Sequence, residues 1–243
     1  MKQNAAAASD PLPGKTTWPP DADSVASMAA MPAASLLVDR LRQYAAELGE
    51  GGLEIHLAGH SAGSIFTANL LVRLAAAGVP VTSMTWLAPA IRVDDFAQLV
   101  LPPLRGGRLA RFASFGLEDK GELDDVVGTG PLTIYHKSLL YLVSRGLETV
   151  KPGGEADVPL VGMQRYASTP MGAQSLAAML SGLRAEFVWA PSAAPVTSRT
   201  SATSHGGFND DAASMTSIML RVLDVNRMSP VNVYRRNAVL AGS

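Results

Sequence analysis

The segment Gly59-His60-Ser61-Ala62-Gly63 matches the pattern G-x-S-x-G. A short apolar segment, 53–58, precedes it, and an apolar segment with helical spacing, 62–77, follows it. In such a strand–turn–helix the turn is so sharp that the serine takes strained backbone angles and its hydroxyl stands at the carboxyl edge of a sheet. Both glycines are expected to be needed there, because a Cβ would collide with the neighbouring strand or helix. The pattern predicts Ser61 as a nucleophile and the backbone N–H of Ala62 as an oxyanion donor.

A serine hydroxyl is a weak nucleophile and needs a general base, for which histidine is the usual choice. The sequence has four histidines: His56, His60, His136 and His205. The first lies inside the predicted strand, the second adjoins Ser61 with a side chain expected to point elsewhere, and the third lies in or opens an apolar helix. His205, in Ser-His-Gly-Gly-Phe, follows the last predicted strand, where a loop can reach back to the serine. We therefore predict that His205 is the base.

A third residue, an acid, should orient the imidazole, and the expected chain order is serine, acid, histidine. Just beyond a predicted strand stand five acidic residues: Glu118, Asp119, Glu122, Asp124 and Asp125. Asp119 is the aspartate nearest the strand end and is the first choice, with Asp124 second and Asp125 third. The spacing of these acids fits no calcium-binding loop, so we expect no metal.

The elements that must position these residues alternate between strand and helix along the chain. The predicted strands are 53–58, 81–88, 108–117 and 186–190, and the predicted helices are 24–48, 62–77, 131–148, 170–183 and 210–225. The apolar run 159–166 is compatible with a strand or a loop. This alternation predicts an α/β fold, with a mostly parallel sheet flanked by helices. We expect one domain over 23–243, after a flexible N-terminal arm over 1–22.

The composition is that of a globular protein. Of 243 residues, 47% are hydrophobic and 17% are charged, and the net charge of −1 gives no sign of a nucleic-acid partner. The sequence contains no cysteine, so disulfides, thiolate zinc sites and cysteine nucleophiles are excluded. No apolar run reaches the length of a signal peptide or a membrane span, and the expectation is a cytoplasmic protein.

The stretches LEIHLAGHSAGS and SHGGF, with the strand pairs between them, resemble the α/β-hydrolase superfamily over about residues 53–225. The esterase and lipase branch is the most similar. The resemblance implies a catalytic triad of Ser61, His205 and an acid, no cofactor, and a small-molecule ester as substrate. It implies hydrolysis through an acyl-enzyme intermediate.

The sequence departs from that family at its front. Only about 52 residues precede Leu53, where such enzymes usually carry four strands and a His-Gly loop with a second oxyanion donor. We expect a truncated α/β-hydrolase fold whose serine-bearing strand lies at the sheet edge. A homo-oligomer is expected to cover that strand or its flanking helices, or the arm 1–22 covers it instead. The alternative function is a non-catalytic or weakly active module used for self-association.

Overall fold

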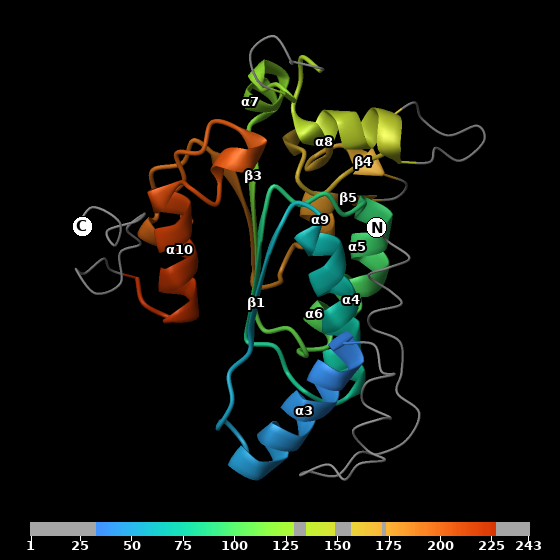
Figure 1. Cartoon of the computed structure of the whole chain (residues 1–243), viewed down its shortest axis with the longest axis vertical. Coiled ribbons are helices and arrows are strands. Elements are labelled where there is room, and N and C mark those ends of the chain that lie inside the picture. The colour runs from blue at the N-terminus through green and yellow to red at the C-terminus, as the bar shows by residue number, and fades with distance from the viewer. Residues whose placement is uncertain (1–32, 129–134, 149–156, 172–173, 227–243) are drawn as a thin grey trace, which may run out of the picture.

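The computed structural model describes residues 33–128, 135–148, 157–171 and 174–226. Figure 1 draws these residues as ribbons. The predicted arm, 1–22, lies outside the described residues.

A four-stranded parallel sheet forms the centre of the molecule. Its strands are β1 (His56–His60), β2 (Ser83–Leu87), β3 (Phe112–Leu117) and β6 (Ala185–Ala190), in the order β1-β2-β3-β6. In register, His60 pairs with Leu87, and Leu87 pairs with Phe115, so the carboxyl ends of the strands meet at one edge. The predicted α/β fold with a parallel sheet and flanking helices is confirmed.

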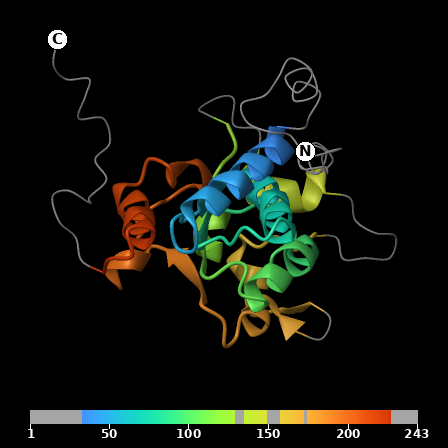
Figure 2. The same cartoon turned by 90° about the horizontal axis from the view of Figure 1, so that it is seen from below.

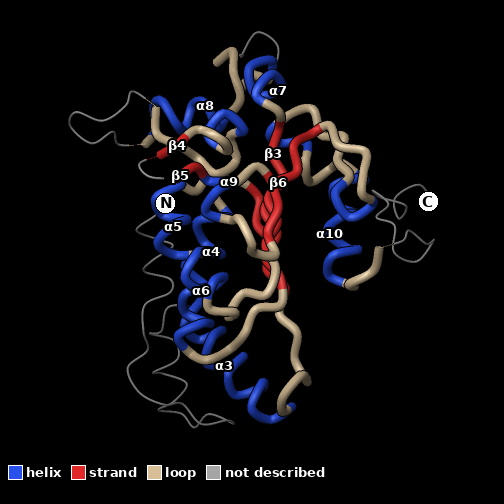
Figure 3. The backbone as a smooth tube through the Cα atoms, turned by 180° about the vertical axis from the view of Figure 1, so that it is seen from behind, coloured by secondary structure: helices blue, strands red, loops and turns tan. Residues whose placement is uncertain are grey.

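The helices are distributed unequally over the two faces of the sheet. Parallel crossovers are right-handed, and each step from β1 to β6 moves in the same direction, so the connections must lie on one face. Figure 3 shows that face covered by α4 (Gly63–Ala76), α5 (Val93–Leu99) and α6 (Leu101–Arg105), while α3 (Ala33–Leu48) lies beyond the amino ends of the strands and packs against α4. The helix α10 (Ala212–Val222) follows β6 and covers the other face, as the view from below also shows (Figure 2). None of the helices in the described ranges is long and apolar enough to cross a membrane.

Each face has its own core. On the α4 side, Trp86 is fully buried between Phe96 and Phe112, and its indole N–H donates to the Thr67 hydroxyl (2.8 Å). On the α10 side, Phe115 of β3 is fully buried. All residues of β2 and β3 are buried, as expected for strands covered on both faces.

Short elements make up the connection between β3 and β6 and the segment between β6 and α10. They are α7 (Asp119–Asp124), α8 (Leu139–Leu142), a π-helical turn (Val143–Leu147), 3₁₀ turns (Gln164–Tyr166, Val196–Ser198 and His205–Gly207), the hairpin β4–β5 (Pro170–Met171 and Gln174–Ser175) and α9 (Leu176–Met179). The predicted helices 131–148 and 170–183 are thus much shorter where they are described. Ser138 and Ser175 accept backbone N–H bonds that start α8 and α9, and Gly182, at a φ of 77°, follows the end of α9.

The strand β1 lies at an edge of the sheet, as the sequence predicted. Its side toward β2 is bonded, because the Ile55 carbonyl oxygen accepts from the Thr82 N–H (2.8 Å) and the Ser61 N–H donates to Leu87 (2.9 Å). Alternation along a strand then turns the backbone groups of the even-numbered residues of β1 outward. Ala58, in the middle of β1, is exposed, and within the described part of the chain no strand pairs with this edge.

Candidate active site

Ser61 occupies the turn between β1 and α4. Its φ is 52°, in the left-handed region that non-glycine residues rarely adopt. Its N–H donates to Leu87 at the end of β2, and its carbonyl oxygen accepts from the Ala90 N–H (3.1 Å) and the Ser64 hydroxyl (2.6 Å). These bonds tie the turn to the end of β2 and to α4, so the surrounding structure holds the strained conformation. The strain that G-x-S-x-G predicts at this serine is present.

The two glycines of the motif are not equivalent. A Cβ added at Gly59 would lie 2.8 Å from the carbonyl carbon and oxygen of Gly63, because the strand and the helix approach closely there. A Cβ added at Gly63 would meet nothing within 4 Å. The expectation that both glycines are needed is therefore right for the first and wrong for the second.

This difference gives a test of the turn by protein stability. Gly59→Ala is expected to lower the free energy of unfolding by about 1–3 kcal/mol, because the new methyl group presses on backbone atoms that cannot move away. Gly63→Ala is the matched control and should leave stability unchanged or slightly higher, since alanine favours a helix. Urea denaturation of both variants measures the difference. Equal midpoints would contradict the tight turn.

Ala62 stands at the start of α4, as the sequence predicted. It is the N-cap residue, with φ −60° and ψ −22°. The first N–H groups of a helix have no partner within the helix, and the helix dipole adds positive potential there. The backbone N–H of Ala62 is therefore suited to binding a developing negative charge beside Ser61.

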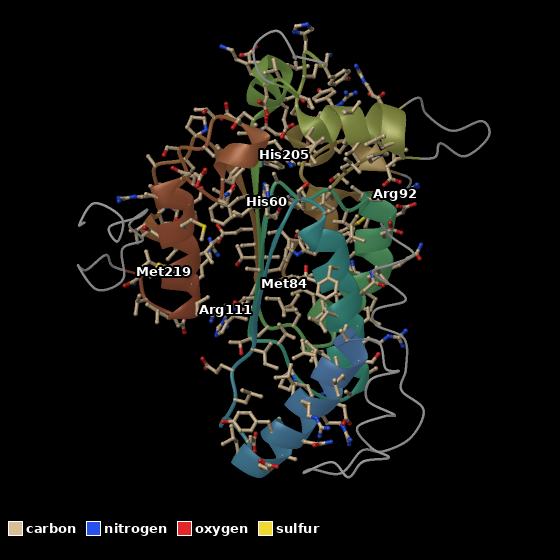
Figure 4. The ribbon with its side chains drawn as sticks, viewed as in Figure 1. His60, Met84, Arg92, Arg111, His205 and Met219 are labelled. Atoms are coloured by element: carbon tan, nitrogen blue, oxygen red, sulfur yellow. The ribbon has the colours of Figure 1, made fainter. Side chains whose placement is uncertain are left out.

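His205, which is far from Ser61 in the sequence, lies at the same edge of the sheet. It lies in the 3₁₀ turn His205–Gly207 and is 5% exposed. Its carbonyl oxygen accepts a hydrogen bond from Nε2 of His60 (2.9 Å), the residue next to Ser61. The two rings lie 5.2 Å apart between centroids, and Figure 4 shows them together at the carboxyl end of the sheet. His60 therefore joins the turn that holds the serine to the turn that holds His205.

The imidazole of His205 is neutral at pH 7. The pKa of His205 is lowered to about 4, mainly by burial and also by the nearby His60, while Asp125 opposes the shift. A neutral ring is the form that accepts a proton from a hydroxyl. Both ring nitrogens are buried and have no hydrogen-bond partner among the described residues, so the bond to the Ser61 hydroxyl is not formed in this structure.

The candidate acids have different neighbours. The Asp119 carboxylate accepts from the Tyr141 hydroxyl (2.8 Å), and Asp124 is exposed. Asp125 accepts from the backbone N–H of His205 (2.8 Å) through Oδ2. Asp119, the first choice from the sequence, thus bonds Tyr141, whereas Asp125, the third choice, bonds His205. In the described residues, no three potential metal-ligating side chains gather.

Ser61, His205 and Asp125 come from three distant segments to one edge of the sheet. No protein-family model, curated protein or solved structure matches this chain. The contacts within the chain are therefore what supports a role for these residues.

The sequence did not reveal a polar network beside the acids. Glu122 is fully buried, and its carboxylate accepts from the Ser138 hydroxyl. Gln164 accepts from the backbone N–H of Asp119 (2.9 Å) through its side-chain oxygen. Nothing in the sequence sets Glu122 apart from the other four acids as buried, and Ser138 could have been recognised only as a helix cap.

Two cavities lie away from this edge. One, of about 360 Å³, lies between α10 and the sheet and is lined by Ser83, Thr85, Arg111 and Leu220 among others. The other, of about 370 Å³, lies beside α5 and is lined by Val93, Pro159 and Met179 among others. Neither is lined by Ser61 or His205, so neither defines a pocket for an acyl group at the candidate site.

Proposed function

We propose that this protein is a serine hydrolase that cleaves carboxylic esters, built on a truncated α/β-hydrolase fold. One observation carries the proposal: Ser61 sits at a φ of 52° in a strand–turn–helix, and a buried, neutral histidine is tied to the adjoining residue. A strained serine in a strand–turn–helix, with a neutral imidazole held to the adjoining residue, supports nucleophilic acyl transfer of the kind that G-x-S-x-G hydrolases perform.

The proposed reaction has two halves. The Ser61 oxygen attacks the ester carbonyl carbon while His205 takes the hydroxyl proton, and the Ala62 N–H binds the oxyanion of the tetrahedral intermediate. The intermediate collapses, the bond to the alcohol breaks, and His205 returns the proton to the departing alcohol. Water then attacks the acyl-enzyme while His205 takes its proton. The bond between the acyl carbon and the Ser61 oxygen breaks, His205 returns the proton to that oxygen, and the carboxylic acid leaves.

Asp125 is the proposed orienting acid, with Asp119 as the alternative. Asp125 already accepts from the backbone N–H of His205. A rotation of its side chain can let the carboxylate accept from the ring N–H of His205 as well. The missing bond between His205 and Ser61 does not oppose this, because catalytic hydrogen bonds often tighten only when substrate binds.

Covalent labelling tests the proposal best. Loss of one oxyanion donor typically lowers the rate by about 10²–10³, and only Ala62 is assigned, so turnover is expected to be slow. A fluorophosphonate should nevertheless attach to Ser61 of the native protein, since it reports an activated serine of any substrate class. Mass spectrometry of the peptide that contains Ser61 measures the adduct. Ser61→Ala and heat-denatured protein are the controls, and labelling of all three alike would contradict the proposal.

The second candidate function is a non-catalytic module for self-association. The exposed edge of β1 favours it, because no strand of the described residues pairs with this edge and such an edge can pair with a second copy of the chain. A dimer in analytical ultracentrifugation, together with a serine that no fluorophosphonate labels, would make this the better reading.

A further inference from the structure

Glu122 is a buried acid beside the candidate triad. It lies in α7 with 0% of its surface exposed. Its Oε2 accepts from the Ser138 hydroxyl, and the Ser138 N–H donates to its carbonyl oxygen (2.9 Å). Its Oε1 is buried and has no hydrogen-bond partner in the part of the chain that the structure describes. A carboxylate left in this way is costly, so the uncharged acid is favoured.

The charges around Glu122 act in the same direction. The pKa of Glu122 is raised to about 8, mainly by burial and also by the negative charges of Asp125 and Asp119, while the Ser138 hydroxyl opposes the shift. On the α8 side Ser138 faces the acid directly, while Lys137 lies over the Tyr141 ring, 5.1 Å from its centroid. Glu122 is therefore neutral below about pH 8 and charged above it.

The position of Glu122 couples it to both candidate acids. Asp119 is the first residue of α7, Glu122 lies one turn later, and Asp125 follows the last residue of the helix, and both aspartates act electrostatically on Glu122. Tyr141, whose N–H donates to the hydroxyl of Ser138 (3.3 Å), donates its own hydroxyl to Asp119, and Asp125 accepts from His205. The bond between Glu122 and Ser138 thus joins α7 to the start of α8. Asp125, which follows α7, contacts His205 next to this junction.

We propose that Glu122 is a positioning residue: as an uncharged acid it holds Asp125 against the His205 turn, and its ionisation at alkaline pH releases that contact and lowers hydrolysis. This inference rests on the proposed function. Ionisation would bury a negative charge at Glu122 beside Asp119 and Asp125, and no cation of the described residues pairs with it, so α7 would have to shift.

The pH profile of kcat/KM tests the inference in the full chain. The wild type is expected to lose activity about tenfold per pH unit above about pH 8. Glu122→Gln cannot ionise and should abolish this alkaline limb while keeping the acid limb that His205 sets. Ser138→Ala removes the bond that lowers the pKa of Glu122, so it should move the limb to higher pH. An unchanged alkaline limb in Glu122→Gln would overturn the inference.

A second readout does not depend on activity. The backbone amide of His205 donates to Asp125, so its ¹H–¹⁵N resonance should shift with a midpoint near pH 8 in the wild type and stay constant in Glu122→Gln. A constant resonance in the wild type would overturn the role of Glu122 whether or not the protein hydrolyses esters. Failure of Ser61 to react with a fluorophosphonate, with the shift still present, would instead overturn only the proposed hydrolase.

Discussion

Replacing His205 with alanine is expected to lower kcat/KM for a short-chain p-nitrophenyl ester by about 10⁴-fold or more. Without the imidazole, the Ser61 hydroxyl has no group that accepts its proton, and the leaving alcohol has no group that returns one. His205 is buried and neutral at pH 7, so its imidazole can accept the Ser61 proton without first losing one. Steady-state hydrolysis near pH 7 measures the loss.

Two other histidines serve as controls for that substitution. His56→Ala removes a ring that bonds the Ser83 hydroxyl (2.8 Å) at the other end of β1, and it should change kcat/KM by no more than a few-fold. His60→Ala removes the link to the His205 carbonyl oxygen, so a moderate loss is expected. Activity that survives in His205→Ala and vanishes in His60→Ala would make His60 the base.

Replacing Asp125 with asparagine is expected to lower kcat/KM by about 10³–10⁴-fold. The change keeps the shape, and the amide oxygen can still accept from the His205 backbone N–H, while the bond that the other oxygen accepts from the exposed Val126 N–H is lost, so the fold should be preserved. It removes the negative charge that stabilises the imidazolium formed when Ser61 gives up its proton. Hydrolysis rates, with circular dichroism to check the fold, measure the effect.

Asp119→Asn is the matched control for that substitution. Asparagine can still accept from the Tyr141 hydroxyl, so a loss of no more than about tenfold is expected. If Asp119→Asn lost more activity than Asp125→Asn, the acid nearest the strand end would be the triad member and the proposed geometry would be wrong.

The strand–turn–helix around Ser61 could be predicted because local rules decide it. Glycines bracket the strand, apolar residues follow at helical spacing, and the serine sits at the only sharp turn that joins them. The alternation of later strands and helices likewise predicted the parallel sheet. The close approach at Gly59 but not at Gly63 depends on how α4 tilts, which no local pattern contains.

The acid could not be chosen from the sequence, because distance along the chain is not distance in space. Asp119 is the aspartate nearest the end of β3, but Asp125, at the far end of α7, is the one that contacts His205. The run 159–166 was ambiguous for a related reason. It forms an isolated bridge from Leu160 to Arg92 and then a 3₁₀ turn, and apolar composition does not separate these from a strand.

The order of the strands has a consequence for folding kinetics. The first three strands are neighbours both in sequence and in space, so their contacts close short loops at small entropic cost. The fourth strand must close a much longer loop, and the segment that contains His205 follows it. The serine turn is therefore expected to assemble early and its base last, so that a nascent chain exposes an inert serine until the final strand docks.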